Sequence, residues 1–497
     1  MIKSVRIKRI NGVRVKKLSY RLSKAPDMPL YLQLYQQIKQ AICRQELAFG
    51  ERLPSKQQLK EHLQISRNTV ESAYQQLVAE GYIQSRPRQG FFVCFQAELA
   101  LTAQKRTKKT PHFAPAPTVR FDFNPNRIDT RHFPLQSWKK CGRHCYGFQQ
   151  REWLSLGDKQ GDLQLRTEIA DYLSASRGVH CSARQIVIGA GVESCLQQLI
   201  LLFNQRYPQP DFTYAMESYG YTKVEKLLRL YGKSVVKLPI TAAAQSVDLS
   251  FLPRCGVNVA YVTPSHLYPF GQVLSISQRQ QLLEWAQARQ DRYIIEDDYD
   301  SEFRYKGKPI PSLQSLDFSD KVIYLGSFSK LLMPALRVSF MVLPKGLLAD
   351  YETYCAFFHA SVSRFEQQRL AEFMRQGEFE RHIHRMRKRY RKKMELLCAL
   401  LAPYKEKIRY YGEHSGFYLL VELLQEPRSP AELVELAQQR DIRLYPVEYQ
   451  DKKLFSMGFG DLTEQQLQQA IAILLEIWQI NAPHFNPPQS AAAPETL

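Results

Sequence analysis

The sequence predicts an α/β protein in two parts: an N-terminal winged helix-turn-helix domain, and a larger domain built on a mostly parallel β-sheet covered by helices. Three observations predict this. Three short helical periodicities and a hairpin pattern occupy residues 29–95, and a charged, proline-rich stretch follows at 96–119. From residue 121 to about residue 479, apolar strands alternate with helices, which is the pattern of a parallel sheet with helical crossovers.

Positive charge is the clearest feature of the composition. Lysine and arginine outnumber aspartate and glutamate by 68 to 48, which gives a formal net charge of +20. Such an excess favours a polyanionic partner, with nucleic acid ahead of a membrane surface and general solubility as the plain alternative. The nine cysteines are scattered and predict reduced thiols in a cytoplasmic protein. Cys141 and Cys145 have no second pair of metal-ligating residues elsewhere in the sequence, so we expect no metal site. We also expect no secretory signal and no membrane partner.

The first two helices are predicted by an apolar face and a cap. Apolar residues recur at every fourth position from Leu30 to Ile42, which gives one apolar helix face. Ser55, with Gln58 three residues later, forms a capping box and starts a second helix. We expect that helix to run to about Leu63.

The third helix and the hairpin after it complete the N-terminal domain. Ser66 is the predicted N-cap, and a short turn separates it from the second helix. The face expected to be buried consists of Val70, Ala73, Tyr74, Leu77 and Val78. Strand-like runs at 82–86 and 90–95 then form a hairpin with arginines near its tip. This order describes a winged helix-turn-helix; the alternative is a small helical protein-interaction module.

The charge placement favours DNA over that alternative. The N-terminus of the third helix attracts phosphate and sets short polar side chains against base edges. The side chains expected to neutralise phosphates are Arg52, Lys56, Arg86 and Arg88. The phrases Leu53-Pro-Ser-Lys56, Ser66-Arg-Asn-Thr-Val70, Glu80-Gly-Tyr82 and Gly90-Phe-Phe-Val93 resemble the GntR-type winged-helix domain. That resemblance implies operator contacts from Arg52, Lys56, Ser66, Arg67, Asn68, Thr69 and the wing around Gly90.

A single lysine organises the larger domain. Lys330 follows a buried strand, Ser327 and Ser329 flank it, and Arg337 lies seven residues on. A lysine beside hydroxyl donors and an arginine suits an imine with an aldehyde cofactor that also carries a phosphate. A second apolar strand ends at Asp297, which would supply the carboxylate that the ring nitrogen of pyridoxal 5'-phosphate (PLP) needs.

Each of these elements has a plainer explanation when taken alone. A Ser-x-Ser-Lys phrase occurs by chance, the acids at 296–298 could form a metal site or cap a strand, and the glycines at 189–191 could form only a turn. Lys330, Asp297, His266 and residues 189–192 nevertheless all follow predicted strands. Because sites in such sheets lie beyond the carboxyl ends of the strands, the combination favours one cofactor pocket.

Longer phrases carry a family resemblance. They are Tyr324-Leu-Gly-Ser-Phe-Ser-Lys330, Pro334-Ala-Leu-Arg337, Glu296-Asp-Asp-Tyr-Asp-Ser-Glu-Phe-Arg-Tyr305 and Val262-Thr-Pro-Ser-His266. Residues 121–480 resemble the fold-type I aminotransferase domain, and nearly the whole chain after residue 28 resembles the MocR-type regulators. The resemblance implies PLP as cofactor, with Lys330 in the internal aldimine, Asp297 on the pyridine nitrogen and Tyr299 on the phenolate oxygen. It further implies phosphate contacts from Arg337, Ser327, Ser329 and the backbone at Ala190, Gly191 and Val192, with Tyr221 stacked on the ring and His266 beside it.

The resemblance predicts a PLP-dependent, DNA-binding transcriptional regulator. It would sense PLP or a small amine or amino acid through an aldimine at Lys330, without physiological turnover, as a domain-swapped homodimer. The alternative is a PLP-dependent aminotransferase with an accessory DNA-binding module, and a third possibility is a DNA-binding protein whose large domain holds no cofactor. Against turnover, Glu448 stands where aminotransferases place an arginine for the substrate carboxylate.

Composition also sets the predicted boundaries. We expect a basic arm at 1–25, the GntR-type winged-helix domain at 26–95, a linker at 96–119, the aminotransferase-like domain at 120–480 and a disordered tail at 481–497. The helix predicted at 378–400 is strongly basic. We expect it to present a solvated face, with a second DNA-contacting surface as the less favoured interpretation.

Overall fold

The computed structural model describes residues 20, 22–23, 28–95, 119–145, 151–209, 212–241, 245–307, 310–355 and 357–480. The chain divides into two compact units at residues 116 and 117. The predicted basic arm, linker and tail lie almost entirely outside the described residues. Across the described part of the chain, no helix combines the length and apolar character needed to cross a membrane.

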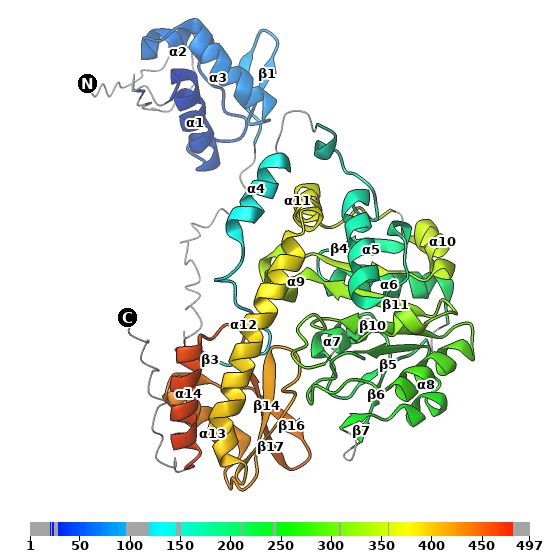
Figure 1. Cartoon of the computed structure of the whole chain (residues 1–497). Helices are drawn as coiled ribbons and strands as arrows, with labels where there is room; N and C mark the ends of the chain where they lie inside the picture. The colour runs from blue at the N-terminus through cyan, green and yellow to red at the C-terminus, as the bar shows by residue number, and fades with distance from the viewer. Residues whose placement is uncertain are drawn as a thin grey trace, which may run out of the picture. The chain divides into compact units, whose positions relative to one another are not determined.

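The first unit contains the predicted three helices and hairpin (Figure 1). The elements are α1 (Leu30–Cys43), α2 (Lys56–Leu63), α3 (Arg67–Ala79), β1 (Ile83–Arg86) and β2 (Gly90–Val93). Ser55 and Gln58 form the predicted capping box, and the β1–β2 hairpin is antiparallel. Val78, expected in the core, is instead 37% exposed. Eight residues turn an α-helix by about 800°, so Val78 lies roughly 80° around the helix from Val70.

Two residues of the predicted basic arm belong to this unit. Tyr20 and Leu22 pack against the apolar core that α1, α2 and α3 share. The Tyr20 hydroxyl is buried, and burial raises the pKa of that phenol. This end of the arm therefore contributes to packing, which neither a disordered segment nor a phosphate contact would do.

The second unit is built on a seven-stranded sheet in the order β4-β12-β11-β10-β9-β5-β6 (Figure 1). The strands are β4 (Ile186–Gly189), β5 (Tyr214–Glu217), β6 (Val235–Leu238), β9 (Val259–Val262), β10 (Tyr293–Asp298), β11 (Val322–Ser327) and β12 (Ser339–Val342). β12 runs antiparallel to both of its neighbours, and the other pairs are parallel. Because β12 lies between β11 and β4 and runs antiparallel to both, β4 and β11 point in the same direction. Their carboxyl ends therefore lie at the same edge of the sheet.

Helices cover both faces of this sheet, because successive side chains of each strand point to opposite faces. Val187 packs with α6 (Val192–Arg206), α7 (Thr222–Leu230) and α10 (Lys345–Tyr354). Its neighbours Ile186 and Ile188 point to the opposite face. The helices on that face are α5 (Leu163–Arg177), α8 (Ile276–Gln287), α11 (Arg364–Arg375) and α12 (Glu378–Leu401). Apolar residues on both faces explain why these strands read as continuous apolar runs.

The C-terminal part adds a smaller sheet in the order β13-β14-β17-β16. Its strands are β13 (Ile408–Tyr411), β14 (Tyr418–Leu423), β16 (Pro446–Tyr449) and β17 (Lys452–Gly458), all antiparallel. The helices α13 (Pro430–Gln439) and α14 (Glu464–Ile477) pack in the same core as α12.

Only some of the basic side chains of α12 face solvent. Lys393, expected on that face, is buried and donates to Asp129 Oδ2 at 3.1 Å and to the Gly460 carbonyl at 2.7 Å. Arg387 donates its Nε to the Glu302 carbonyl at 2.6 Å. These two cations connect α12 to other parts of the domain.

Candidate functional site

The carboxyl ends of β10 and β11 bring the predicted lysine and aspartate to one cavity. β11 ends at Ser327, which caps the short helix α9 (Phe328–Leu331) by accepting from the Ser329 N–H at 3.2 Å. α9 carries Lys330, and β10 ends with Asp297 and Asp298. Lys330 and Asp297 line a cavity of about 370 Å³, which is a usual size for a small-molecule site.

The Lys330 amine faces an aromatic ring. Its Nζ lies 4.5 Å from the centroid of Tyr299 and 6.0 Å from that of Phe417. Burial lowers the pKa of Lys330, and the carboxylates of Asp300 and Asp297 oppose that shift. A lowered pKa increases the neutral, nucleophilic fraction of the amine.

Asp297 is held by a tyrosine that the sequence interpretation missed. The Tyr261 hydroxyl, from β9, donates to Asp297 Oδ2. Burial raises the pKa of Asp297 to about 6, while the Tyr261 hydrogen bond and Lys330 act in the opposite direction. A cationic group bound against this carboxylate would favour its ionised form.

Hydroxyl and guanidinium groups also line the cavity, from Ser327, Ser329 and Arg337. Ser329 Oγ is buried without a hydrogen-bond partner among the described residues, while Ser327 Oγ accepts from Ser339 at 2.9 Å. Gly191 has φ 99°, and a Cβ there would collide with the Arg337 guanidinium. An unpartnered buried hydroxyl beside an arginine and a glycine turn fits a phosphate group.

The Arg337 guanidinium is already paired, which the sequence interpretation did not foresee. Its Nη2 donates to Glu193 Oε2 at 2.8 Å and to the Ala190 carbonyl at 3.4 Å. Burial acts to raise the pKa of Glu193, but a backbone hydrogen bond and Arg337 lower it overall. An incoming phosphate therefore competes with a carboxylate for Arg337.

His266 packs against the Tyr299 ring and is not among the described residues that line the cavity. Its Nδ1 lies 2.8 Å from Asp300 Oδ2, and its ring stacks on Tyr299 and Tyr418. The Tyr299 hydroxyl donates to the His266 carbonyl at 2.8 Å. His266 is therefore in a position to orient Tyr299.

The remaining predicted residues divide between lining and non-lining positions. Tyr221 and Val192 line the cavity, and so do Glu193 and Tyr418, which the sequence interpretation did not select. Glu448, expected at the place of a carboxylate clamp, lies exposed on β16 and is absent from the described lining. The β16–β17 register sets it opposite Lys453.

The first unit presents the start of α3 to solvent. Ser66 Oγ accepts from the Thr69 N–H at 3.1 Å and lies 2.8 Å from Thr69 Oγ1. Arg67 and Asn68 follow the cap and are exposed. The cap therefore fixes the helix start while the next two side chains remain available for contacts.

The other predicted DNA-contacting residues surround the hairpin. Arg52 forms a β-bridge with Phe92, and a Cβ on Gly90 would lie 3.4 Å from Arg52 Nε. The Arg86 guanidinium lies 4.5 Å from the Phe92 ring centroid, and Arg88 is exposed at the turn. The Lys56 Nζ pairs with Glu71 Oε1 at 2.6 Å.

Comparisons with known proteins agree with both units. Residues 30–93 match the family model "Bacterial regulatory proteins, gntR family", and residues 116–497 match "Aminotransferase class I and II". The chain is 38% identical to the HTH-type transcriptional regulator YdeL of Bacillus subtilis, over 92% of this chain and 99% of YdeL. It is 31% identical to the probable rhizopine catabolism regulatory protein MocR of Rhizobium meliloti, over 76% of this chain and 78% of MocR. Among solved structures, Pyrococcus horikoshii kynurenine aminotransferase in complex with PMP has a similar fold, with a TM-score of 0.61, 22% identity, and coverage of 74% of this chain and 93% of that one.

Proposed function

The chain belongs to the MocR-type transcriptional regulators, in which a gntR-family DNA-binding domain is joined to an aminotransferase-like domain, and we propose that the Lys330 cavity binds PLP and senses PLP itself or a small amine or amino acid. The observation that carries the proposal is the Lys330 amine, with its lowered pKa, beside Tyr299 and Asp297. We further infer that the protein acts in the cytoplasm as a domain-swapped homodimer, because two linked DNA-binding domains can read paired half-sites.

The residues present fit PLP. Asp297 would hold the ring nitrogen, Tyr299 and Tyr221 would contact the ring, and Ser327, Ser329, Arg337 and the backbone from Ala190 to Val192 would hold the phosphate. Bound PLP supplies an aldehyde that reacts with amines and a ring that withdraws electrons. The chain's own part is to lower the pKa of Lys330, to fix Asp297 through Tyr261, and to exchange Glu193 for the phosphate at Arg337.

The lining favours sensing over transamination. Arg337 is the only arginine among the described lining residues, and the phosphate would occupy it, so no second guanidinium remains for a substrate carboxylate. Incubation of the PLP-loaded protein with amino donors and keto acids should therefore give at most a single turnover. Multiple turnovers at enzyme-like rates would instead favour the aminotransferase.

Replacing Glu193 with glutamine should tighten PLP binding by up to about fivefold. The substitution removes a carboxylate that competes with the phosphate for Arg337, and half-exposed ion pairs contribute up to about 1 kcal/mol. The measurement is a fluorescence titration of apoprotein with PLP. Glu352→Gln, which changes an exposed carboxylate paired only at 3.9 Å with Arg184, is the control. Equal affinities for Glu193→Gln and the original protein would show that the Glu193 carboxylate does not compete with the phosphate for Arg337.

Replacing Arg88 with glutamine should lower the salt dependence of DNA binding. Arg88 is exposed at the hairpin tip, and one lost phosphate contact reduces the slope of log K against log[salt] by about 1. Affinity should fall on operator and unrelated DNA alike, because phosphate contacts carry no sequence information. Arg44→Gln, at the exposed C-cap of α1, is the charge-matched control. An unchanged slope in Arg88→Gln would place the hairpin tip away from DNA.

A further inference from the structure

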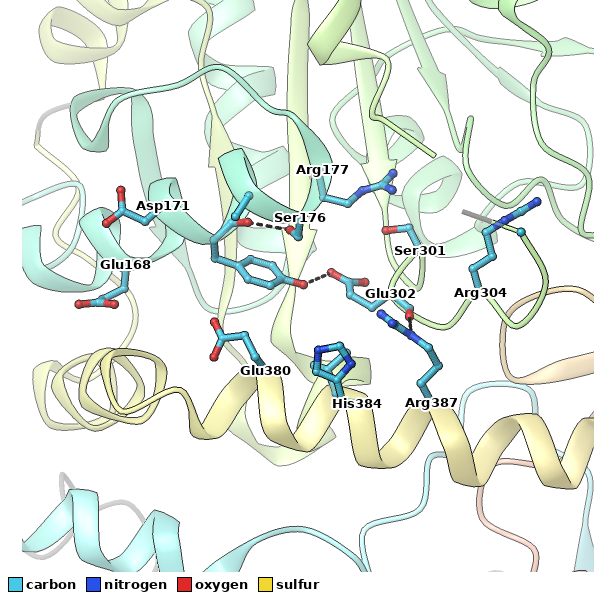
Figure 2. A pocket seen from close by; sticks show the side chains of 14 residues that line it. Glu168, Asp171, Ser176, Arg177, Ser301, Glu302, Arg304, Glu380, His384 and Arg387 are labelled. Atoms are coloured by element: carbon cyan, nitrogen blue, oxygen red, sulfur yellow. Dashed lines mark hydrogen bonds between the residues drawn. The ribbon is translucent and has the colours of Figure 1, made fainter. Parts of the chain in front are cut away.

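A second cavity, of about 540 Å³, lies in the larger unit and shares no described lining residue with the Lys330 cavity. Figure 2 shows α5 and α12 on two of its sides and the segment after β10 on a third. Its volume suits a small organic ligand. None of the roles proposed for the Lys330 cavity uses it.

Most of the charged side chains around this cavity are separated by sign, and Arg177 and Glu302 lie between the two groups (Figure 2). Glu380 and Arg387 share one face of α12 and lie seven residues apart, or about 10.5 Å along the helix axis. Figure 2 shows the carboxylates of Glu168, Asp171 and Glu380 toward one end, and the guanidinium groups of Arg304 and Arg387 toward the other. The cavity therefore has a negative end and a positive end.

Several buried polar atoms at this cavity lack a hydrogen-bond partner among the described residues. They are Glu302 Oε2, Glu380 Oε2, Ser301 Oγ and Arg304 Nε. Nearly all buried polar atoms in native proteins have a partner, so a cluster of four without one points to a missing polar ligand. Carboxylate oxygens accept and guanidinium nitrogens donate, so this ligand needs both a donor and an acceptor.

Two hydrogen bonds hold Glu302, which lines the cavity where a polar ligand would bind. The Tyr172 hydroxyl donates to Glu302 Oε1 at 2.9 Å, and Arg387 holds the Glu302 carbonyl at 2.6 Å. Burial and the neighbouring Asp298 raise the pKa of Glu302 to about 7. An ammonium group beside Oε2 would favour the ionised carboxylate and would satisfy the unpartnered oxygen.

We propose that this cavity is a second binding site, for a small zwitterion whose ammonium and carboxylate groups are separated by several bonds, such as an ω-amino acid. The ammonium lies against Glu302 and Glu380, and the carboxylate lies against Arg304 and Arg387. An α-amino acid carries both charges on neighbouring atoms, so it cannot contact both ends across two helical turns. The site is independent of any chemistry at Lys330.

The test is calorimetric titration of the full-length Lys330→Ala protein, in which the Lys330 amine is absent. The probes are 6-aminohexanoate, hexylamine, hexanoate and glycine. We expect saturable binding of one 6-aminohexanoate per chain, and affinities at least about tenfold weaker for the other three, because each loses one end of the cavity. No saturable binding of 6-aminohexanoate, or equal affinity for hexylamine, would overturn the proposal.

Substitutions locate the binding within the protein. Glu302→Gln keeps an acceptor for Tyr172, and it should weaken 6-aminohexanoate binding about tenfold or more, as should Arg304→Gln. Glu380→Gln serves as a second variant if thermal unfolding shows that Glu302→Gln disturbs the fold. Glu395→Gln and Arg389→Gln change exposed residues of α12 outside the cavity and should bind as before. Unchanged binding in both Glu302→Gln and Glu380→Gln would place the ligand elsewhere and reject this cavity.

Discussion

Replacing Lys330 with alanine is expected to abolish the near-visible absorbance band of lysine-bound PLP and to weaken PLP retention by about a hundredfold or more. The physical reason is the loss of the amine that attacks the aldehyde, since no other lysine lies as close to Tyr299 and Asp297 in the described lining. In the original protein, attachment should accelerate as pH rises and level off below the usual lysine pKa of about 10.4, because burial lowers the pKa of Lys330.

Lys223 provides the matched control for this change. It also lines the cavity, with its Nζ 5.8 Å from the Tyr221 ring, and Lys223→Ala removes an equal charge without removing the amine near Asp297. The absorbance band should survive in Lys223→Ala and should be sensitive to borohydride reduction. A band that persisted in Lys330→Ala would assign the cofactor to another amine, and no band in the original protein would favour a regulator that holds no PLP.

The features that depend on residues close together in the sequence could be predicted. The N-caps at Ser55 and Ser66 depend on residues within one helical turn, so a sequence pattern contains both partners. Lys330 and Asp297 lie at strand ends, and parallel strands bring such ends to one edge. The family phrases fall on these same positions, because tight strand-to-helix turns and buried sites restrict which residues fit.

Features that depend on distant pairs were not predictable in this way. Tyr261 meets Asp297 across 36 positions, and Arg337 meets Glu193 across 144, so neither contact has a local signature. The strands β5 and β6 were not predicted either. The antiparallel direction of β12 follows from the way α9 and Arg337 return the chain beside β11, which strand periodicity does not encode.

The largest effect on DNA recognition is expected from Arg67. The Arg67→Ala variant should lose about 10- to 100-fold in operator affinity, because a bidentate arginine contact with a base discriminates by about 1–3 kcal/mol. Arg67 is exposed at the first position of α3, directly after the Ser66 cap. That position points a side chain toward the major groove in helix-turn-helix proteins. Binding to unrelated DNA should fall much less, since it depends on phosphate contacts alone.

The measurement is a competition titration of labelled operator against unrelated DNA at fixed salt. Arg44→Ala removes the same charge from the exposed end of α1, and should change both affinities slightly and equally. The ratio of operator to unrelated affinity therefore separates a base contact from a phosphate contact. If Arg67→Ala lowered both affinities together, Arg67 would be a phosphate contact. If it lowered neither, α3 would not be the recognition helix, and the side chains around the hairpin would have to read the operator.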